Sequence, residues 1–186
     1  LSAVIFFAPV LDRFTTSLIG PAEDNMQTFW NIWWVNQPVA INQGNIFFTK
    51  FLFFPEGSSL FFHTLSPYNL VFSVVLAKFW GIVLTYNILL ILAFVFSGIT
   101  AFYLIRYLVG GSFAPLIGGF IYAFNPFNFA QAQHHLNIVS VQFIPLTILF
   151  LIKSMRFGKK ADLFWLIVFL VLSALCSWHY FVYLLY

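Results

Sequence analysis

Long uncharged apolar runs alternate along this chain with one extended polar region near its start. Residues 57–77, 79–105, 107–152 and 163–186 contain no Asp, Glu, Lys or Arg. A helix that crosses a bilayer needs about 20 apolar residues, whereas a secretory signal has only about 7–15 and occurs once. Because the long runs recur, we expect an all-α, polytopic helical membrane protein.

Proline, glycine and polar residues divide the apolar runs into candidate membrane helices. We interpret residues 1–10 as the outer end of a first membrane-spanning helix, closed by Pro9. The other candidate spans are 66–81, 83–105, 112–125, 137–152 and 163–183. The first residue is Leu1 and the last, Tyr186, lies within an apolar run, so we expect residues 1–186 to be one transmembrane domain from the N-terminal part of a longer protein.

The polar region, residues 12–65, is expected to form one large external loop. It holds four of the five acidic residues and several Gly and Pro turn signals, and 66–186 supply the spans and short loops that follow. Within the loop, 25–36 has helical periodicity, with four aromatic residues and a methionine on one side and polar residues on much of the other. Tryptophan is typical of the headgroup region, so we expect an amphipathic helix that lies flat on the membrane.

Composition supports a membrane protein and argues against a nucleic-acid-binding protein and a cysteine-based framework. The chain is 62% apolar and 7% charged, against about 25% charged in a soluble domain. A net charge of +3, without a basic stripe, does not indicate a nucleic-acid partner. Cys176 is the single cysteine, so the chain holds neither a disulfide framework nor a thiolate metal site.

Orientation follows from the basic connections between spans. Arg106 lies in one connection, and Lys153, Arg156, Lys159 and Lys160 lie in another. If both connections are cytoplasmic, the acidic loop and the polar stretch 127–136 face outside, and 66–81 must be interfacial or re-entrant. If 66–81 crosses fully, either the basic connections lie outside or the acidic loop lies inside. The basic bias favours the first arrangement.

Glu23 and Asp24 are the first candidates for chemistry. Adjacent carboxylates at the start of an interfacial helix could supply a general base or bind a divalent cation, Mg or Mn, through oxygen. The competing explanation is structural. Asp24 is a candidate N-cap, and Gln27 would complete a capping box.

Histidines form the second group of candidates. Adjacent His134 and His135 lack the spacing of a metal-ligand pair on a helix, but each could contact a phosphate or sugar, or simply be a polar loop residue. The expected topology gathers further candidate binding residues on the same side, although each has an ordinary turn or interfacial explanation: Glu56, His63, Trp178 and His179.

Five stretches together resemble the multi-spanning glycosyltransferases of the GT-C fold, especially the large uncharacterised bacterial and archaeal members. They are GPAEDNMQTFWNIWWVNQ, FFPEGSSLFFHTLSPYN, TYNILLILAFVFSGITAFYLIRYLVG, IYAFNPFNFAQAQHHLNIVSVQFIPL and SWHYFVYLL. The resemblance covers essentially the whole chain and is carried by loose motifs. It implies a cell-envelope enzyme of the prokaryotic plasma membrane with its active site on the extracytoplasmic side.

The resemblance also implies an activity. Such enzymes take a hexose or pentose from a polyprenyl-phosphate donor and transfer it, here with inversion, to a glycan, lipid or protein acceptor. Asp24 would be the base or a metal ligand, with Glu23 second; the acids are adjacent rather than spaced as in many family members. Two alternatives remain: a transporter or lipid flippase of the same build, and a non-catalytic membrane scaffold in which Asp24 is only a helix cap.

Overall fold

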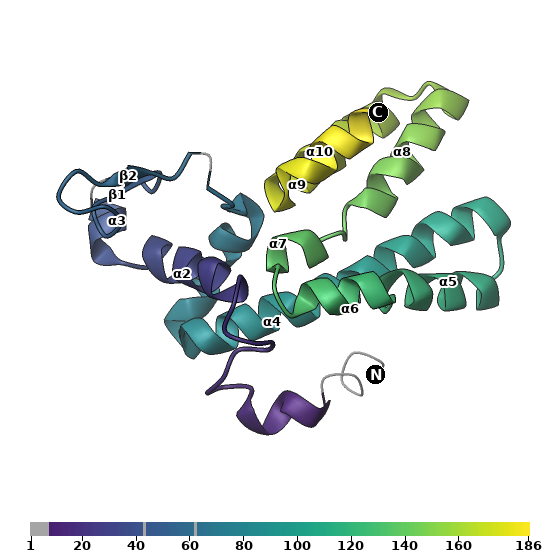
Figure 1. The fold of residues 1–186 in the computed structure, drawn as a ribbon. Coiled ribbons are helices and arrows are strands. Elements are labelled where there is room, and N and C mark those ends of the chain that lie inside the picture. Colours follow the sequence, from purple (N-terminus) through teal and green to yellow (C-terminus); the bar gives the residue numbers. More distant parts are fainter. Residues whose placement is uncertain (1–7, 43, 62) are drawn as a thin grey trace.

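A computed structural model describes residues 8–42, 44–61 and 63–186, which form a largely helical chain (Figure 1). The predicted all-α class is confirmed, apart from one very short strand pair. A 3₁₀ helix, η1, spans Ala8–Arg13, so most of the predicted first span lies outside the described residues. The elements that follow are α2 (Asn25–Val35), α3 (Pro38–Asn42), β1 (Phe48–Thr49), β2 (Ser58–Ser59), α4 (Pro67–Val109), α5 (Phe113–Ala123), α6 (Pro126–Ala132), α7 (Leu136–Val139), α8 (Ile144–Phe157), α9 (Lys160–Cys176) and α10 (Trp178–Leu185).

Among the described residues, two helical segments are long and apolar enough to cross a membrane: Pro67–Val109 and Leu136–Phe157, which comprises α7 and α8. The other predicted spans are shorter than expected. The segment predicted at 112–125 forms α5, of 11 residues, and the segment at 163–183 is interrupted at Ser177, whose extended backbone separates α9 from α10. The number of helices that cross the membrane therefore stays a prediction.

The two predicted spans 66–81 and 83–105 form one continuous element with a break. Inside α4, Gly81 adopts φ 73° and ψ 170°, a conformation that only glycine reaches at low cost. Figure 1 shows that α4 changes direction near its first third, so 67–80 and 82–109 do not continue along one axis. The interfacial or re-entrant placement of 66–81 stays a prediction.

The basic connections lie together at one end. Arg106 is in the last turn of α4, Arg156 is in the last turn of α8, and Lys160 begins α9. In Figure 1 the α4–α5 and α8–α9 connections are both on the side away from α2, α3 and the strand pair. The polar loop and the basic turns are thus at opposite ends of the helices, as the charge pattern predicts.

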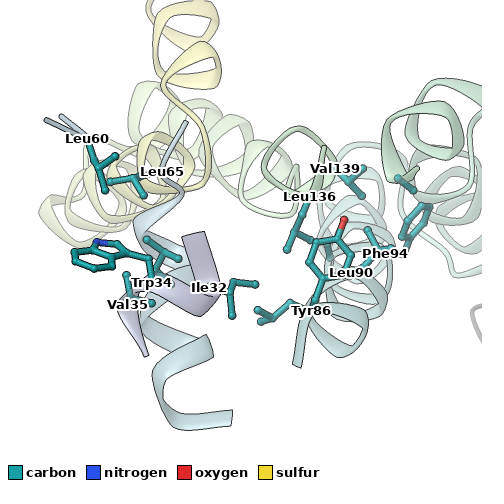
Figure 2. Packing of buried hydrophobic residues seen from close by; sticks show 14 of the residues in the cluster. Ile32, Trp34, Val35, Leu60, Leu65, Tyr86, Leu90, Phe94, Leu136 and Val139 are labelled. Atoms are coloured by element: carbon teal, nitrogen blue, oxygen red, sulfur yellow. The ribbon is translucent and has the colours of Figure 1, made fainter. Parts of the chain in front are cut away.

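The core joins the polar loop to the helices (Figure 2). Ile32 and Trp34 of α2 are completely buried, as are Tyr86 and Leu90 of α4 and Leu136 of α7. The Trp34 indole nitrogen donates a hydrogen bond to the Ile46 carbonyl oxygen, so the ring is satisfied although it is buried. The loop is therefore a packed part of the fold.

The α2 helix confirms the predicted element but corrects its orientation. Thr28 and Asn31, predicted on the polar outer side, are buried, and Asn31 donates to the Thr64 carbonyl oxygen. Trp30 and Trp33 are partly exposed, while Trp34 is fully buried. The polar side of α2 does not face water, because its amide side chains form hydrogen bonds with the rest of the loop.

Candidate functional site

The two acidic residues and the two adjacent histidines lie on one shallow, open depression of about 430 Å³. The segment before α2 forms one wall, and α6 with the turn after it forms the other. Its lining consists of Glu23, Asp24, Ala130, Gln131, Gln133, His134 and His135. The structure therefore brings together the two motifs that topology had placed on one side.

The contacts form two parallel pairs. His134 Nδ1 lies 3.2 Å from Glu23 Oε2, and His135 Nε2 lies 3.6 Å from Asp24 Oδ2. The histidine side chains are about one third exposed and the carboxylates about two thirds, at 32% and 64% in the first pair and 34% and 68% in the second. Solvent screens such pairs, so each contributes at most about 1 kcal/mol to folding.

Asn87, in the second part of α4, fixes the backbone that leads into the acidic pair. Its side-chain nitrogen donates to the carbonyl oxygens of Phe14 and Ser17, at 2.7 and 2.8 Å, and its Oδ1 accepts from the Ile19 nitrogen at 3.0 Å. The residue is fully buried. A single amide thus holds three backbone groups of the incoming loop in place of water.

Two further residues complete the positioning of this wall. Asn25 is fully buried, and its Oδ1 accepts from the Glu23 nitrogen at 3.0 Å. Gly20 has φ +100°, and a Cβ there would collide with the Gln133 backbone. The absence of a side chain at Gly20 lets the two walls meet.

The capping role predicted for Asp24 is wrong. Asp24 does precede α2, but it has αR backbone angles and its side chain makes no capping hydrogen bond. Gln27 donates its backbone nitrogen to the Asp24 carbonyl oxygen, and its side chain contacts His63, so no capping box forms. The Asp24 carboxylate faces His135 instead.

The opposite wall is built by backbone turns around α6. Asn125 caps α6, accepting from the Asn128 nitrogen at 2.9 Å, and the His134 and His135 nitrogens both donate to the Gln131 carbonyl oxygen. His135 is the residue before α7, whose Leu136 is anchored in the core. Neighbouring histidines in this turn can therefore face two neighbouring acids.

His63 belongs to the segment between β2 and α4; it packs against α2 and does not line the depression. Its Nε2 lies 2.8 Å from Asn31 Oδ1, and its Nδ1 lies 3.4 Å from Gln27 Nε2. The Gln27 amide nitrogen donates to Nδ1, and the Asn31 amide oxygen accepts from Nε2. This pattern of one accepting and one donating ring nitrogen is that of the neutral ring. Burial lowers the pKa of His63. This residue holds the loop against α2.

The other sequence candidates also lie away from the depression. Glu56 is exposed in the turn between β1 and β2. Trp178 and His179 are exposed in the first turn of α10, where His179 Nδ1 contacts Ser177 Oγ at 3.1 Å. The Tyr180 hydroxyl donates to the Ile138 carbonyl oxygen, which ties this turn to α7. Their predicted substrate contacts remain predictions.

Carboxylate and imidazole groups are suitable ligands for a divalent cation. In the described part of the chain, however, no group of three or more His, Cys, Asp or Glu side chains is arranged to hold one. Each carboxylate faces an imidazole rather than its neighbour. Metal dependence stays a prediction of the resemblance.

Sequence reasoning missed the residues that position the site. Asn87 is the clearest of these residues. It is the lone amide in the apolar run 79–105, and a polar side chain inside a membrane span usually has a structural or functional role. Gln131 also lines the depression, and its buried Oε1 has no hydrogen-bond partner. A repeated glutamine before the histidine pair was the available signal there.

Comparison of the chain with protein-family models, with curated proteins and with solved structures finds no match.

Proposed function

We propose that the chain is part of an integral membrane glycosyltransferase that moves a sugar from a polyprenyl-phosphate donor to an extracytoplasmic acceptor. One observation carries this proposal: Glu23 and Asp24 meet His134 and His135 across an open depression at the end of the molecule opposite the basic turns. The two apolar helical segments long enough to span a bilayer support the membrane setting.

In this proposal Asp24 is the general base. The acceptor hydroxyl oxygen attacks the anomeric carbon, its proton passes to the Asp24 carboxylate, and the bond between the anomeric carbon and the phosphate oxygen breaks. The electron pair leaves with the polyprenyl phosphate, and attack opposite the leaving group inverts the configuration. A base positioned in this way contributes about 10²–10⁴-fold to the rate.

The histidines orient the carboxylates and meet the leaving phosphate. No Lys or Arg is among the described residues that line the depression, so we assign the contact with the departing phosphate to the imidazole N–H groups of His134 and His135. Each imidazole has one nitrogen near a carboxylate and a second nitrogen on the far side of the ring. Such a ring can hold an acid with one nitrogen and donate to phosphate with the other.

The test is transfer of radiolabelled sugar by the full-length protein in membrane vesicles, with a panel of hexosyl and pentosyl polyprenyl phosphates. We expect Asp24→Asn to lower transfer at least about 100-fold. It should change the free energy of unfolding by less than about 0.5 kcal/mol, because the carboxylate is exposed and caps nothing. Asp162→Asn, which removes an acid from the first turn of α9, is the matched control and should retain transfer.

Two results would contradict the proposal. Undiminished transfer by Asp24→Asn would remove Asp24 as the base. Absence of transfer by the wild-type protein with every donor, together with movement of the labelled lipid between leaflets, would favour the flippase alternative.

A further inference from the structure

A second polar feature lies inside the helices, away from the acidic depression. A partly enclosed cavity of about 150 Å³ is bounded by both parts of α4 and by the segment just before α8. Tyr68 and Phe72 come from the first part of α4, Ala93 and Phe96 from the second, and Gln142 precedes α8. The break at Gly81 makes this cavity, because it folds the two parts of α4 around it.

Gln142 leaves one buried hydrogen-bond acceptor unused. The side chain is 2% exposed, and its nitrogen lies 3.7 Å from Cys176 Sγ. Its Oε1 is buried and has no hydrogen-bond partner, although the Tyr68 hydroxyl lies close to the same amide. An unpaired buried acceptor is unfavourable, so a ligand that donates one hydrogen bond here would be favoured.

The rest of the wall selects against charge. The described residues that line the cavity include no Asp, Glu, Lys, Arg or His, so a phosphate, carboxylate or ammonium group would be buried without a counter-charge. Most of this wall is aromatic or aliphatic, and its polar groups are those of Tyr68, Asn69 and Gln142, so the acceptor faces a largely apolar space. A single hydroxyl attached to an apolar chain needs only one acceptor.

The cavity has a side that faces the surroundings. Phe72 and Phe96, which line it, are 46% and 43% exposed on the outside of the helices. In a membrane these two rings would contact acyl chains. A volume of about 150 Å³ suits a benzene-sized group, which corresponds to a hydroxyl and its first few carbons.

We propose that this cavity binds the uncharged hydroxyl head of a membrane lipid, with the hydroxyl donating to Gln142 Oε1 and the chain leaving between Phe72 and Phe96. The proposal rests on the membrane setting of the proposed function and is independent of sugar transfer. It defines a lipid-alcohol site distinct from the acidic depression.

The experiment uses the full-length protein in lipid nanodiscs and three photoreactive probes. Each probe is a long-chain molecule with a diazirine near its head, which is a free alcohol, a methyl ether or a phosphate monoester. Labelled peptides are identified by mass spectrometry. The apolar groove between α4 and α5, lined by Ile99 and Leu116, reports general exposure to lipid and should be labelled equally by the alcohol and the ether.

We expect the alcohol to label the peptides around Phe72 and Phe96 about fivefold or more above the ether, which corresponds to one hydrogen bond. Gln142→Leu should abolish this preference. Ala93→Phe keeps the acceptor but fills the cavity, and it should abolish labelling there while leaving the α4–α5 groove unchanged. Gel filtration and the groove labelling show that each variant is folded.

Three outcomes would overturn the proposal: equal labelling by alcohol and ether, an alcohol preference that survives Gln142→Leu in folded protein, or cavity labelling no higher than background, as expected for a water-filled space. Sugar transfer is measured on the same preparations. A protein that transfers sugar but shows no alcohol preference disproves only the lipid-alcohol site, and the converse result disproves only the transferase.

Discussion

The acidic depression differs in exposure and charge from the Asn87 cluster, by which we mean buried Asn87 and the backbone groups of Phe14, Ser17 and Ile19 that it bonds. The two regions therefore contribute differently to stability and to chemistry. The depression pairs charged groups that are largely open to water, where an ion pair adds little to stability. The Asn87 cluster uses one neutral amide with no exposed surface to satisfy three backbone groups. The buried amide secures the fold, and the exposed pairs are left available for chemistry.

The largest structural effect should follow the loss of Asn87. Asn87→Leu leaves the carbonyl oxygens of Phe14 and Ser17 and the Ile19 nitrogen without their partner, so we expect a loss of about 2–4 kcal/mol in the free energy of unfolding. Unfolding of the purified protein in mixed micelles measures it.

Thr85 offers the matched control on the same helix. Its hydroxyl is fully buried and has no hydrogen-bond partner, so Thr85→Val should be neutral or stabilising. Equal destabilisation by both substitutions would mean that any polar change at this level of α4 is disruptive and that Asn87 has no specific role.

A smaller effect is expected at the contact between the two walls of the depression. Gly20→Ala combines a positive φ with a collision against the Gln133 backbone, so we expect a loss of about 2 kcal/mol and reduced sugar transfer in the folded fraction. The thermal midpoint and the specific activity test it.

Gly158→Ala is the control for strain alone. Gly158 also has a positive φ, of +62°, but a Cβ there would meet open space, so the cost should be about 1 kcal/mol with unchanged transfer. If both variants lost activity equally, the close approach at Gly20 would not matter for the site.

The smallest effect concerns His63, which links the loop to α2 without lining the depression. Burial lowers the pKa of His63 below its usual value of 6.5, so folding favours the neutral ring. Its stabilising contribution is complete above pH 6.5 and is lost as the pH falls toward the lower folded-state pKa.

We therefore expect a shallow acid-side fall in the stability of the wild type that is reduced in His63→Gln, measured as the thermal midpoint against pH. An identical profile for wild type and His63→Gln would contradict this role.

The helices could be predicted from the sequence wherever the apolar periodicity ended at a helix-terminating residue. Residues 25–36 are predicted from their helical periodicity, and α8 and α9 from apolar runs that a basic connection separates. The break at Gly81 was also located, as the boundary between two spans, but not as a bend within one element. Periodicity does not report the direction in which a chain continues after a glycine.

The meeting of the acids and histidines followed from topology alone, because the sequence separates them widely. Pairwise contacts could not be predicted, since they depend on the close approach at Gly20 and on the side-chain bonds of Asn87 and Asn25. The capping role of Asp24 failed for a related reason. A local rule assigned the carboxylate to its own helix, whereas a tertiary partner, His135, was available to it.

The most direct test of the central claim is a cysteine cross-link between the first loop and the histidine turn in the intact membrane protein. In a Cys176→Ser background, Asp24→Cys with His135→Cys should be joined by a short bifunctional thiol reagent, because the native side chains approach to 3.6 Å and the shorter cysteines leave a gap that such a reagent spans. The pair Glu56→Cys with His135→Cys should not. Absence of the first cross-link, or equal formation of both, would contradict a shared site.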